Sequence, residues 1–395
     1  MKKISLAVLA LFSQAISLFA QVDSTAYKHR KLRIDQVNLV SGYYTQDGNN
    51  SAVTGGIGTE KLTDLANTID LHMVARDKKY RLHSFSFEMG IDHYTSASSD
   101  KIDPGTISSA SYSDTRYYPS LNWSMKNEPK NLTVGAGVSY STEYDYKSIG
   151  INANIAKGSA DNNREFAAKL QAYFDTWKVI LPVELRQNVT TEDGSIGTKP
   201  RNSFSTSLSY SQVINQRFQL ALLADGIYQS GLLATRYQRV YFTDNSVAVE
   251  NLPGIRVKLP LGLRAYYFIG SRFILRGYYR FYWDDWGISA HTVSLEVPIK
   301  FGPFVSISPF YRFYSQNASK YFSPYHTHVI GQEFYTSDYD LSRFSSQFFG
   351  TGVRYVPEKG ILGIRHWYAI ELRYGHYIRT TGLHSDIVSL DAAFK

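Results

Sequence analysis

The sequence predicts an all-β protein: a transmembrane antiparallel β-barrel of about sixteen strands, with short periplasmic turns and long extracellular loops. Three observations predict it. Apolar and polar residues alternate with a period of two in segments that recur from Gln36 onward. Short and long connections alternate between these segments. The last segment runs to Phe394, next to the C-terminus, as in the closing strand of an outer-membrane barrel.

The predicted strands are short alternating segments, and most are near the ~9–11 residues that a tilted strand needs to cross a bilayer. They span residues 36–46, 67–76, 81–95, 116–126, 131–142, 146–156, 164–176, 203–213, 218–229, 255–268, 272–283, 292–299, 304–314, 346–356, 367–379 and 385–394.

The connections indicate which kind of β-protein this is. Short turns follow the even strands, at 77–80, 127–130, 214–216, 270–271 and 300–303. Long loops follow most odd strands, at 47–66, 96–115, 177–202, 230–254 and 315–345. The connections 143–145 and 284–287 are short where the pattern expects long ones. This alternation is typical of outer-membrane barrels, and a soluble sandwich gives no reason for it.

The two faces of the strands differ in the way that a membrane barrel requires. In 272–283, one face carries Phe273, Tyr279 and Trp283, whereas the other carries arginines and tyrosines. An apolar face with aromatic ends suits lipid, and a polar face suits a wet lumen. In the last strand, Val388 and Phe394 share the apolar face with the residues between them at a spacing of two.

The N-terminus has the pattern of a secretory signal: two lysines, an apolar run and small residues near Ala20. We expect a signal peptide at 1–20, a periplasmic segment at 21–35 and the barrel at 36–395, in the bacterial outer membrane after cleavage. The alternative is a retained membrane anchor, which the shortness of the apolar run disfavours.

Composition excludes several classes of protein. The chain has no cysteine, which excludes disulfides, thiol catalysis and cysteine-ligated metals. Aromatic residues make up 15% of the chain, enough for girdles at two membrane interfaces. The formal charge of +8 is dispersed along the strands, without a basic run or nucleic-acid motif, so we expect no nucleic-acid partner.

The first strand and the loop after it contain a distinctive motif, Val40-Ser-Gly-Tyr-Tyr-Thr-Gln-Asp-Gly-Asn-Asn50 followed by Val53-Thr-Gly-Gly-Ile-Gly-Thr-Glu60. The motif resembles a family of bacterial outer-membrane proteins known as domain of unknown function 3570. The resemblance implies a barrel in the outer membrane of a Gram-negative bacterium, and it implies no established activity. It also makes a role beside envelope redox or flavin-transfer proteins conceivable. Val53-Thr-Gly-Gly56 does not fit a covalent flavin acceptor, so we expect no cofactor.

The lumen is the first candidate functional site. Strand parity places a set of charged residues there: Arg264, Arg276, Arg280, Arg312, Arg373 and Arg379, with the acids Glu88, Asp225, Glu296 and Glu371. Arginines facing carboxylates would set a field across a pore, and their excess favours anions. The alternative is that these charges merely solvate the wall and stabilise neighbouring strands.

Two loops are further candidates. Asp47, Asn49, Asn50 and Asp64 offer oxygen ligands for a hard cation, but Asp-Gly-Asn-Asn is also ordinary turn chemistry. The loop is not an EF-hand, because Glu60 comes thirteen residues after Asp47. His326 and His328 have a spacing that could bind zinc or copper, although such pairs are common by chance, and we expect no metal site.

We expect no enzyme, because the chain has no Gly-x-Ser-x-Gly elbow. His72 and Asp70 share a lumen face, as many polar pairs do. The hypothesis is a channel or transporter for small polar solutes, with anions favoured. The alternative is a non-conducting scaffold or receptor that holds a partner in an envelope complex. Outer-membrane lipid and the barrel-assembly machinery are the other expected partners.

Overall fold

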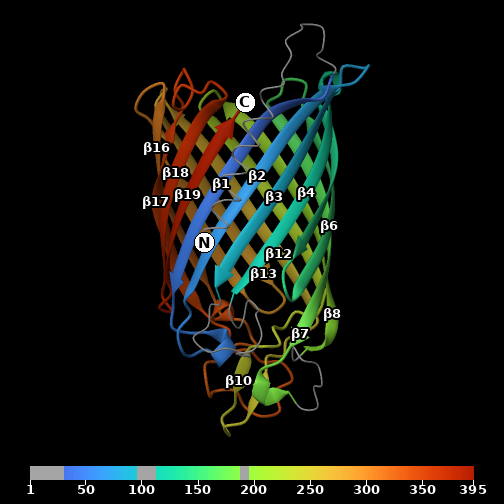
Figure 1. Cartoon of the computed structure of the whole chain (residues 1–395), viewed down its shortest axis with the longest axis vertical. Helices are drawn as coiled ribbons and strands as arrows, with labels where there is room; N and C mark the ends of the chain where they lie inside the picture. The colour runs from blue at the N-terminus through green and yellow to red at the C-terminus, as the bar shows by residue number, and fades with distance from the viewer. Residues whose placement is uncertain (1–30, 96–112, 187–194) are drawn as a thin grey trace.

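The chain forms a closed antiparallel barrel in the computed structural model, which describes residues 31–95, 113–186 and 195–395 (Figure 1). The sheet has 17 strands, of which β14 and β15 share one position between β13 and β16, so sixteen positions surround the lumen. The predicted signal peptide at 1–20 lies outside the described residues. The described part of the chain contains no helix long and apolar enough to cross a membrane.

Each predicted strand corresponds to an observed one. The barrel strands are β1 Arg33–Asp47, β2 Leu62–Arg76, β3 Leu82–Thr95, β4 Ser113–Asn127, β5 Leu132–Thr142, β6 Tyr146–Gly158, β7 Arg164–Ile180, β8 Ser195–Asn215, β9 Phe218–Gly231, β12 Ile255–Ile269, β13 Phe273–Asp284, β14 Ser289–Glu296, β15 Ile299–Lys300, β16 Val305–Gln316, β17 Phe344–Tyr355, β18 Trp367–Arg379 and β19 His384–Phe394. Pro298 separates β14 from β15, because proline has no N–H to give to the sheet.

The connections contain the remaining elements of the described chain. They are the hairpin of β10 Arg239–Tyr241 and β11 Val247–Val249 and four short 3-10 helices, η1 Ala52–Thr54, η2 Glu128–Lys130, η3 Val183–Leu185 and η4 Tyr339–Leu341.

The barrel closes where its first and last strands pair. β1 and β19 are antiparallel, with Val37 opposite Phe394 and Asp47 opposite His384. The ring of Phe394 stacks on that of Trp367 in β18, with centroids 5.6 Å apart. Val37 and Phe394 belong to one buried apolar cluster at this seam. The prediction that the last strand closes the barrel is therefore confirmed.

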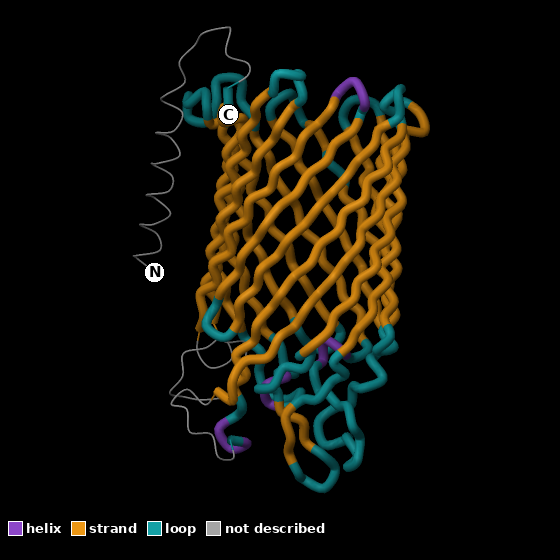
Figure 2. The backbone as a smooth tube through the Cα atoms, turned by 90° about the vertical axis from the view of Figure 1, so that its right-hand side faces the viewer, coloured by secondary structure: helices purple, strands orange, loops and turns teal. Residues whose placement is uncertain are grey.

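The two ends of the barrel differ as the sequence predicted. The C-terminus and the short turns lie at one end, the upper end in Figures 1 and 2. The β10–β11 hairpin and the long connections 48–61, 232–254 and 317–343 gather below the opposite end (Figure 2). We call these the turn end and the loop end. One turn-end connection, 356–366, is longer than expected, and Gly360 and Gly363 bend it back with positive φ angles.

The outer face of the barrel is a continuous apolar belt. Leu170 is 58% exposed, Ile149 55% and Leu222 52%, and similar residues follow around the sheet. Their sheet neighbours of opposite parity point into the lumen. Exposed apolar area of this extent marks contact with another apolar phase, which for a closed barrel is lipid. The face assignment for 272–283 is the one predicted from the sequence, since Phe273, Tyr279 and Trp283 are exposed on the outside.

Candidate functional site

One side of the lumen carries a dense set of arginines, which we call the arginine wall. It comprises Arg264 on β12, Arg276 and Arg280 on β13, Arg312 on β16, Arg354 on β17 and Arg373 on β18. Each has the parity opposite to the exposed apolar residues of its strand, such as Leu263, Tyr279 and Leu372. Sequence reasoning missed Arg354, although its alternation with the apolar Val353 and Tyr355 carried the signal.

Cross-strand pairing arranges these residues in rows. In one row, Arg264 lies opposite Tyr278, which lies opposite Ser294, and Ser294 lies opposite Arg312. Arg312 in turn lies opposite Phe348. The next row crosses the same strands in the same order, and it consists of Tyr266, Arg276, Glu296, Phe310 and Gly350. Guanidinium groups and aromatic rings therefore alternate both along and across the strands.

Three arginines of the wall belong to an ion-pair network. Glu296 lies 3.7 Å from Arg276 and 3.3 Å from Arg373, measured between nitrogen and oxygen. Glu371 lies 3.0 Å from Arg373 and 3.5 Å from Arg354. The network therefore contains three arginines and two glutamates, and it holds Arg373 between two carboxylates.

A glycine creates the space for this network. A Cβ atom at Gly352 would lie 3.0 Å from Cγ of Arg373 and 3.2 Å from Oε1 of Glu371. A larger residue there would press on both charged side chains. The inner face of β17 therefore carries no side chain at Gly352, where the side chain of Arg373 extends toward Glu296.

The other arginines of the wall have no carboxylate at ion-pair distance within the described chain. Each instead lies over an aromatic ring: Arg312 is 4.9 Å from the centroid of Phe348, Arg264 is 5.9 Å from that of Tyr278, and Arg280 is 5.9 Å from that of Tyr282. Cation–π contact restrains a guanidinium but uses none of its N–H donors. These donors remain available to a solute.

A cavity of about 490 Å³ lies against the arginine wall. Arg264, Arg276, Arg312 and Arg373 line it together with Glu296 and the rings of Tyr266, Tyr278, Phe310 and Phe348. The volume is within the range of small-molecule sites, about 300–1,000 Å³. Four of the six arginines predicted for the lumen, all but Arg280 and Arg379, thus meet at one place with Glu296.

The opposite side of the lumen is lined by small polar residues. Asn152, Asn154, Ser205 and Ser207 occupy inward positions on β6 and β8, and Asp225 lies opposite Ser207. Asp225 lines a separate cavity of about 320 Å³. In the sheet register, Glu88 lies opposite Asp70 of β2 and opposite Ser120 of β4, away from the ion-pair network. Glu88 therefore belongs to the other side of the lumen, whereas Asp225 lies on β9, the strand that pairs with β12 at the edge of the arginine wall.

Beyond the arginine wall, the loop end is covered by interlocking connections. We call residues 48–61, 232–254 and 317–343 the loop cap. Arg239 donates to the backbone oxygen of Val53 at 2.9 Å and to the carboxylate of Glu184. The hydroxyl of Thr336 donates to Glu250. Segments far apart in the sequence thereby form one layer.

Arg379 in the barrel joins the loop cap through Asp340. Sequence parity placed Arg379 in the lumen, and its side chain is 5% exposed beneath the cap. It therefore acts as a link between β18 and the 317–343 connection rather than as part of the open wall.

The loop motif predicted from sequence lies at the junction of the loop cap and the barrel. Asp47 pairs with Lys61 at 3.1 Å, and the amide of Asn50 donates to the backbone oxygen of Thr381 at 2.6 Å. A Cβ on Gly382 would approach the amide nitrogen of Asn49 to 3.2 Å. Burial and the nearby Asp340 raise the pKa of Glu60 to about 7. These contacts fix the loop, as turn chemistry would.

The two histidines considered as metal ligands are engaged with the protein. His328 is 1% exposed, and its ring nitrogens lie 3.1 Å from Oε1 of Gln332 and 3.0 Å from the backbone oxygen of Thr336. His326 has a positive φ and contacts the backbone oxygen of Phe242. The described residues contain no group of three or more histidines, aspartates or glutamates that could hold a metal.

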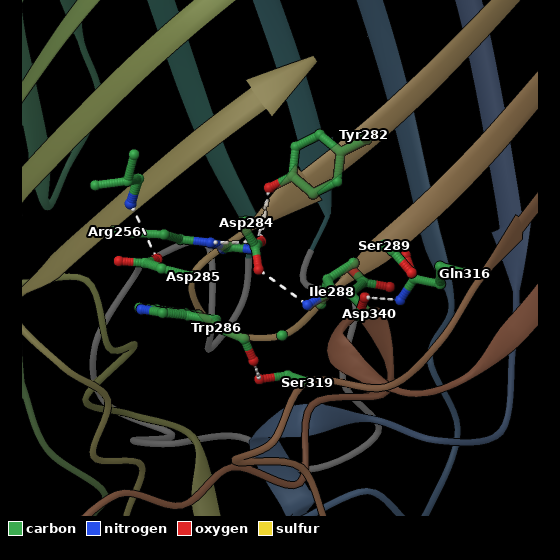
Figure 3. A network of polar contacts seen from close by, with 12 residues as sticks. Arg256, Tyr282, Asp284, Asp285, Trp286, Ile288, Ser289, Gln316, Ser319 and Asp340 are labelled. Atoms are coloured by element: carbon green, nitrogen blue, oxygen red, sulfur yellow. Dashed lines mark hydrogen bonds and ion pairs between the residues drawn. The ribbon is translucent and has the colours of Figure 1, made fainter. Parts of the chain in front are cut away.

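A buried polar hub connects the wall to the loop cap (Figure 3). Asp284 is fully buried and accepts hydrogen bonds from Arg256 at 3.0 Å, Tyr282 at 2.7 Å and the backbone N–H of Ile288 at 3.0 Å. Arg256 also lies 4.2 Å from the ring centroid of Trp286. The sequence showed only an unusually short connection here; its buried aspartate was not predicted.

Asp70 and His72 do form a pair, 2.7 Å apart. The hydroxyl of Ser86, however, donates to Asp70 at 3.2 Å. A serine nucleophile must donate to the histidine base instead. This group of residues therefore lacks the order of contacts that hydrolysis needs.

Residues 84–361 match the model of a family described as "Protein of unknown function (DUF3570)". The match spans most of the chain, so the chain belongs to this family, and the resemblance inferred from the sequence is confirmed. A search of curated proteins found no match.

Several solved barrels are similar in structure. A bacterial polysaccharide outer membrane secretin has 10% identity over 91% of this chain and 98% of its own, with a TM-score of 0.45. OccK1 (OpdK) of Pseudomonas aeruginosa has 10% identity, coverage of 91% and 97%, and a TM-score of 0.42. A BenF-like porin from Pseudomonas fluorescens Pf-5 has 10% identity over 91% of this chain and 98% of its own, with a TM-score of 0.41. Similarities this low carry no argument about what the chain does.

Proposed function

We propose that this DUF3570 barrel is an outer-membrane channel that passes small polar solutes and favours anions. The observation that carries the proposal is the arginine wall, where Arg264, Arg280 and Arg312 keep guanidinium donors without a carboxylate partner in the described chain. A sixteen-stranded barrel is wide enough for an aqueous passage. The apolar outer belt supports placement in lipid.

Charge on the wall supports selection for anions. The six arginines face Glu296, Glu371 and Asp391, so cations outnumber acids along this side. The facing strands carry asparagines and serines at the inward positions of β6 and β8, and the carboxylates of Asp70 and Glu88 on β2 and β3. Low-dielectric walls focus such a field and raise the local concentration of anions. An anion would therefore travel along the arginine wall.

The loop cap favours a second candidate function, a receptor or scaffold barrel. Its segments are joined to one another and to the barrel through Glu250, Arg239 and Arg379. A fixed layer at one mouth is a surface on which an envelope partner could dock. Such a barrel would stay closed to ions.

Conductance of the refolded mature protein in a planar bilayer tests the channel, with heat-modifiable gel mobility as the check on folding. We expect steady steps and a reversal potential that indicates anion preference under a salt gradient. The variant with Arg264→Gln, Arg280→Gln and Arg312→Gln should lose most of that preference. Lys169→Gln, on the facing wall, is the matched control and should keep it. A folded but silent barrel would contradict the channel and favour the scaffold.

A further inference from the structure

We propose that the cavity on the arginine wall is a binding site for aromatic carboxylates, small flat rings that carry one negative charge. The inference deepens the proposed function, and it rests on that function for the route by which such a solute arrives. The cavity holds about 490 Å³ and contains both guanidinium groups and aromatic rings. A site for inorganic anions would need only the guanidinium groups and not the aromatic rings.

The spacing of the row through Arg264 and Arg312 leaves room for a ring. Tyr278 and Ser294 stand between these two arginines, one on each intervening strand. Three strand-to-strand steps separate the arginine backbones by about 14 Å. Serine is the smallest side chain in this row, so the gap opens between Tyr278 and Arg312.

The carboxylate end of the site is Arg312. Its guanidinium lies 4.9 Å from the centroid of Phe348, and Phe348 packs 5.0 Å from Phe310. Both rings fill the hollow at Gly350 and Gly375: a Cβ at Gly375 would come within 2.6 Å of Phe348. The rings therefore hold the guanidinium in place, and a fixed fork of N–H donors suits a carboxylate.

The ring end of the site is Tyr278, with Tyr266 beside it on the neighbouring strand. An aryl ring between Arg312 and Tyr278 would lie against a phenol face while its carboxylate meets the guanidinium. Glu296, the acid that lines this cavity, is engaged by Arg276 and Arg373. Its charge is therefore balanced within the wall and does not repel an incoming carboxylate.

The test compares benzoate with cyclohexanecarboxylate, which has the same charge and a similar size but no aromatic face. Chloride current is recorded through single wild-type channels, and the duration of each interruption of the current gives the residence time of the acid in the pore. We expect benzoate to stay about twofold to tenfold longer, the range that a ring-on-ring contact supports.

Tyr278→Leu should bring the ratio of residence times close to one. Arg312→Gln should shorten both residence times. Tyr173→Leu and Lys169→Gln, on the facing wall, are the controls.

Saturation-transfer NMR from the folded barrel to benzoate measures binding without any current. Equal residence times for the two acids in wild type, or an unchanged ratio in Tyr278→Leu, would overturn the ligand class and leave an anion channel intact. A silent barrel that still transfers saturation to benzoate, and loses this in Tyr278→Leu, would overturn the channel and support the site. Absence of both current and transfer would overturn both.

Discussion

Single buried residues determine how the arginine side of the barrel meets the loop cap, and Asp284 is the foremost of them. Its carboxylate accepts from Arg256, Tyr282 and Ile288 while being wholly shielded from solvent. A charge so placed is tolerated because every partner is satisfied. Removing the carboxylate would leave Arg256, whose side chain is 14% exposed, buried without its partner.

We expect Asp284→Ala to lower the free energy of unfolding by about 3 kcal/mol or more, the usual consequence of breaking a buried ion pair. Urea unfolding of the barrel in lipid vesicles measures it. Asp285→Asn is the matched control, because Asp285 accepts one backbone N–H from Val257 through Oδ1 and asparagine retains that oxygen. Equal stability of the two variants would show that the hub does not contribute to folding.

At this scale the sequence predicted positions better than roles. Strand parity placed Arg264, Arg276 and Arg312 on the inner face, because the side-chain period of a strand is a local property. It could not show that Glu296 pairs with Arg373, since a hydrogen bond across two intervening strands depends on the bare backbone at Gly352. Likewise, His326 has a positive φ. The backbone there is not extended, so the two histidines lose the strand geometry in which a spacing of two points both rings the same way.

Among the elements, the loop cap is the one whose stability should depend on pH. Glu250 is buried between the hairpin and the 317–343 connection and accepts from Thr336 and from the backbone of Thr235. Burial, with Asp338 nearby, raises the pKa of Glu250 to about 8. Burial and Asp340 raise the pKa of Asp338 to about 7. The closed cap therefore binds protons that the open cap releases.

The sign follows from linkage. A carboxyl whose pKa is raised in the closed state favours closure fully at pH values below its ordinary pKa, and this advantage is lost as pH rises. The cap should therefore hold best below about pH 4 and open more readily as pH rises from there to about 8. Hydrogen exchange of the cap amides at several pH values measures this. Glu250→Gln should flatten the profile, whereas Glu333→Gln, at an exposed position of the same connection, should not. A cap equally protected at pH 5 and pH 9 would contradict the prediction.

The strands could be predicted because their signal is local, but the loop cap could not. Period-two alternation and turn residues specify where each strand runs. The contacts of the cap join residues far apart in sequence, such as Asn50 to Thr381 and Arg239 to Val53. No spacing along the chain encodes such pairs, so the loops were predicted as connections and their assembly into one layer was not.

At the scale of the whole molecule, closure of the barrel depends on the seam between β1 and β19. Sixteen positions form a ring only if the last strand finds the first, since an unpaired edge is not stable in lipid. The register from Val37 opposite Phe394 to Asp47 opposite His384 extends over the whole of β19. Phe394, the last residue of β19, adds an aromatic contact at the turn end, on Trp367.

We expect Phe394→Ala to weaken this seam, because truncating a buried aromatic side chain typically costs about 3–5 kcal/mol. The loss should appear as a smaller fraction of heat-modifiable, closed barrel after refolding and as a lower urea midpoint for what does fold. Phe313→Ala provides the comparison, since Phe313 is also a phenylalanine of the outer face but is 39% exposed. Its removal deletes lipid-facing area alone and should leave both measurements near wild type. If the two variants refold and unfold alike, the seam does not limit assembly, and the hydrogen bonds between β1 and β19 suffice to close the ring.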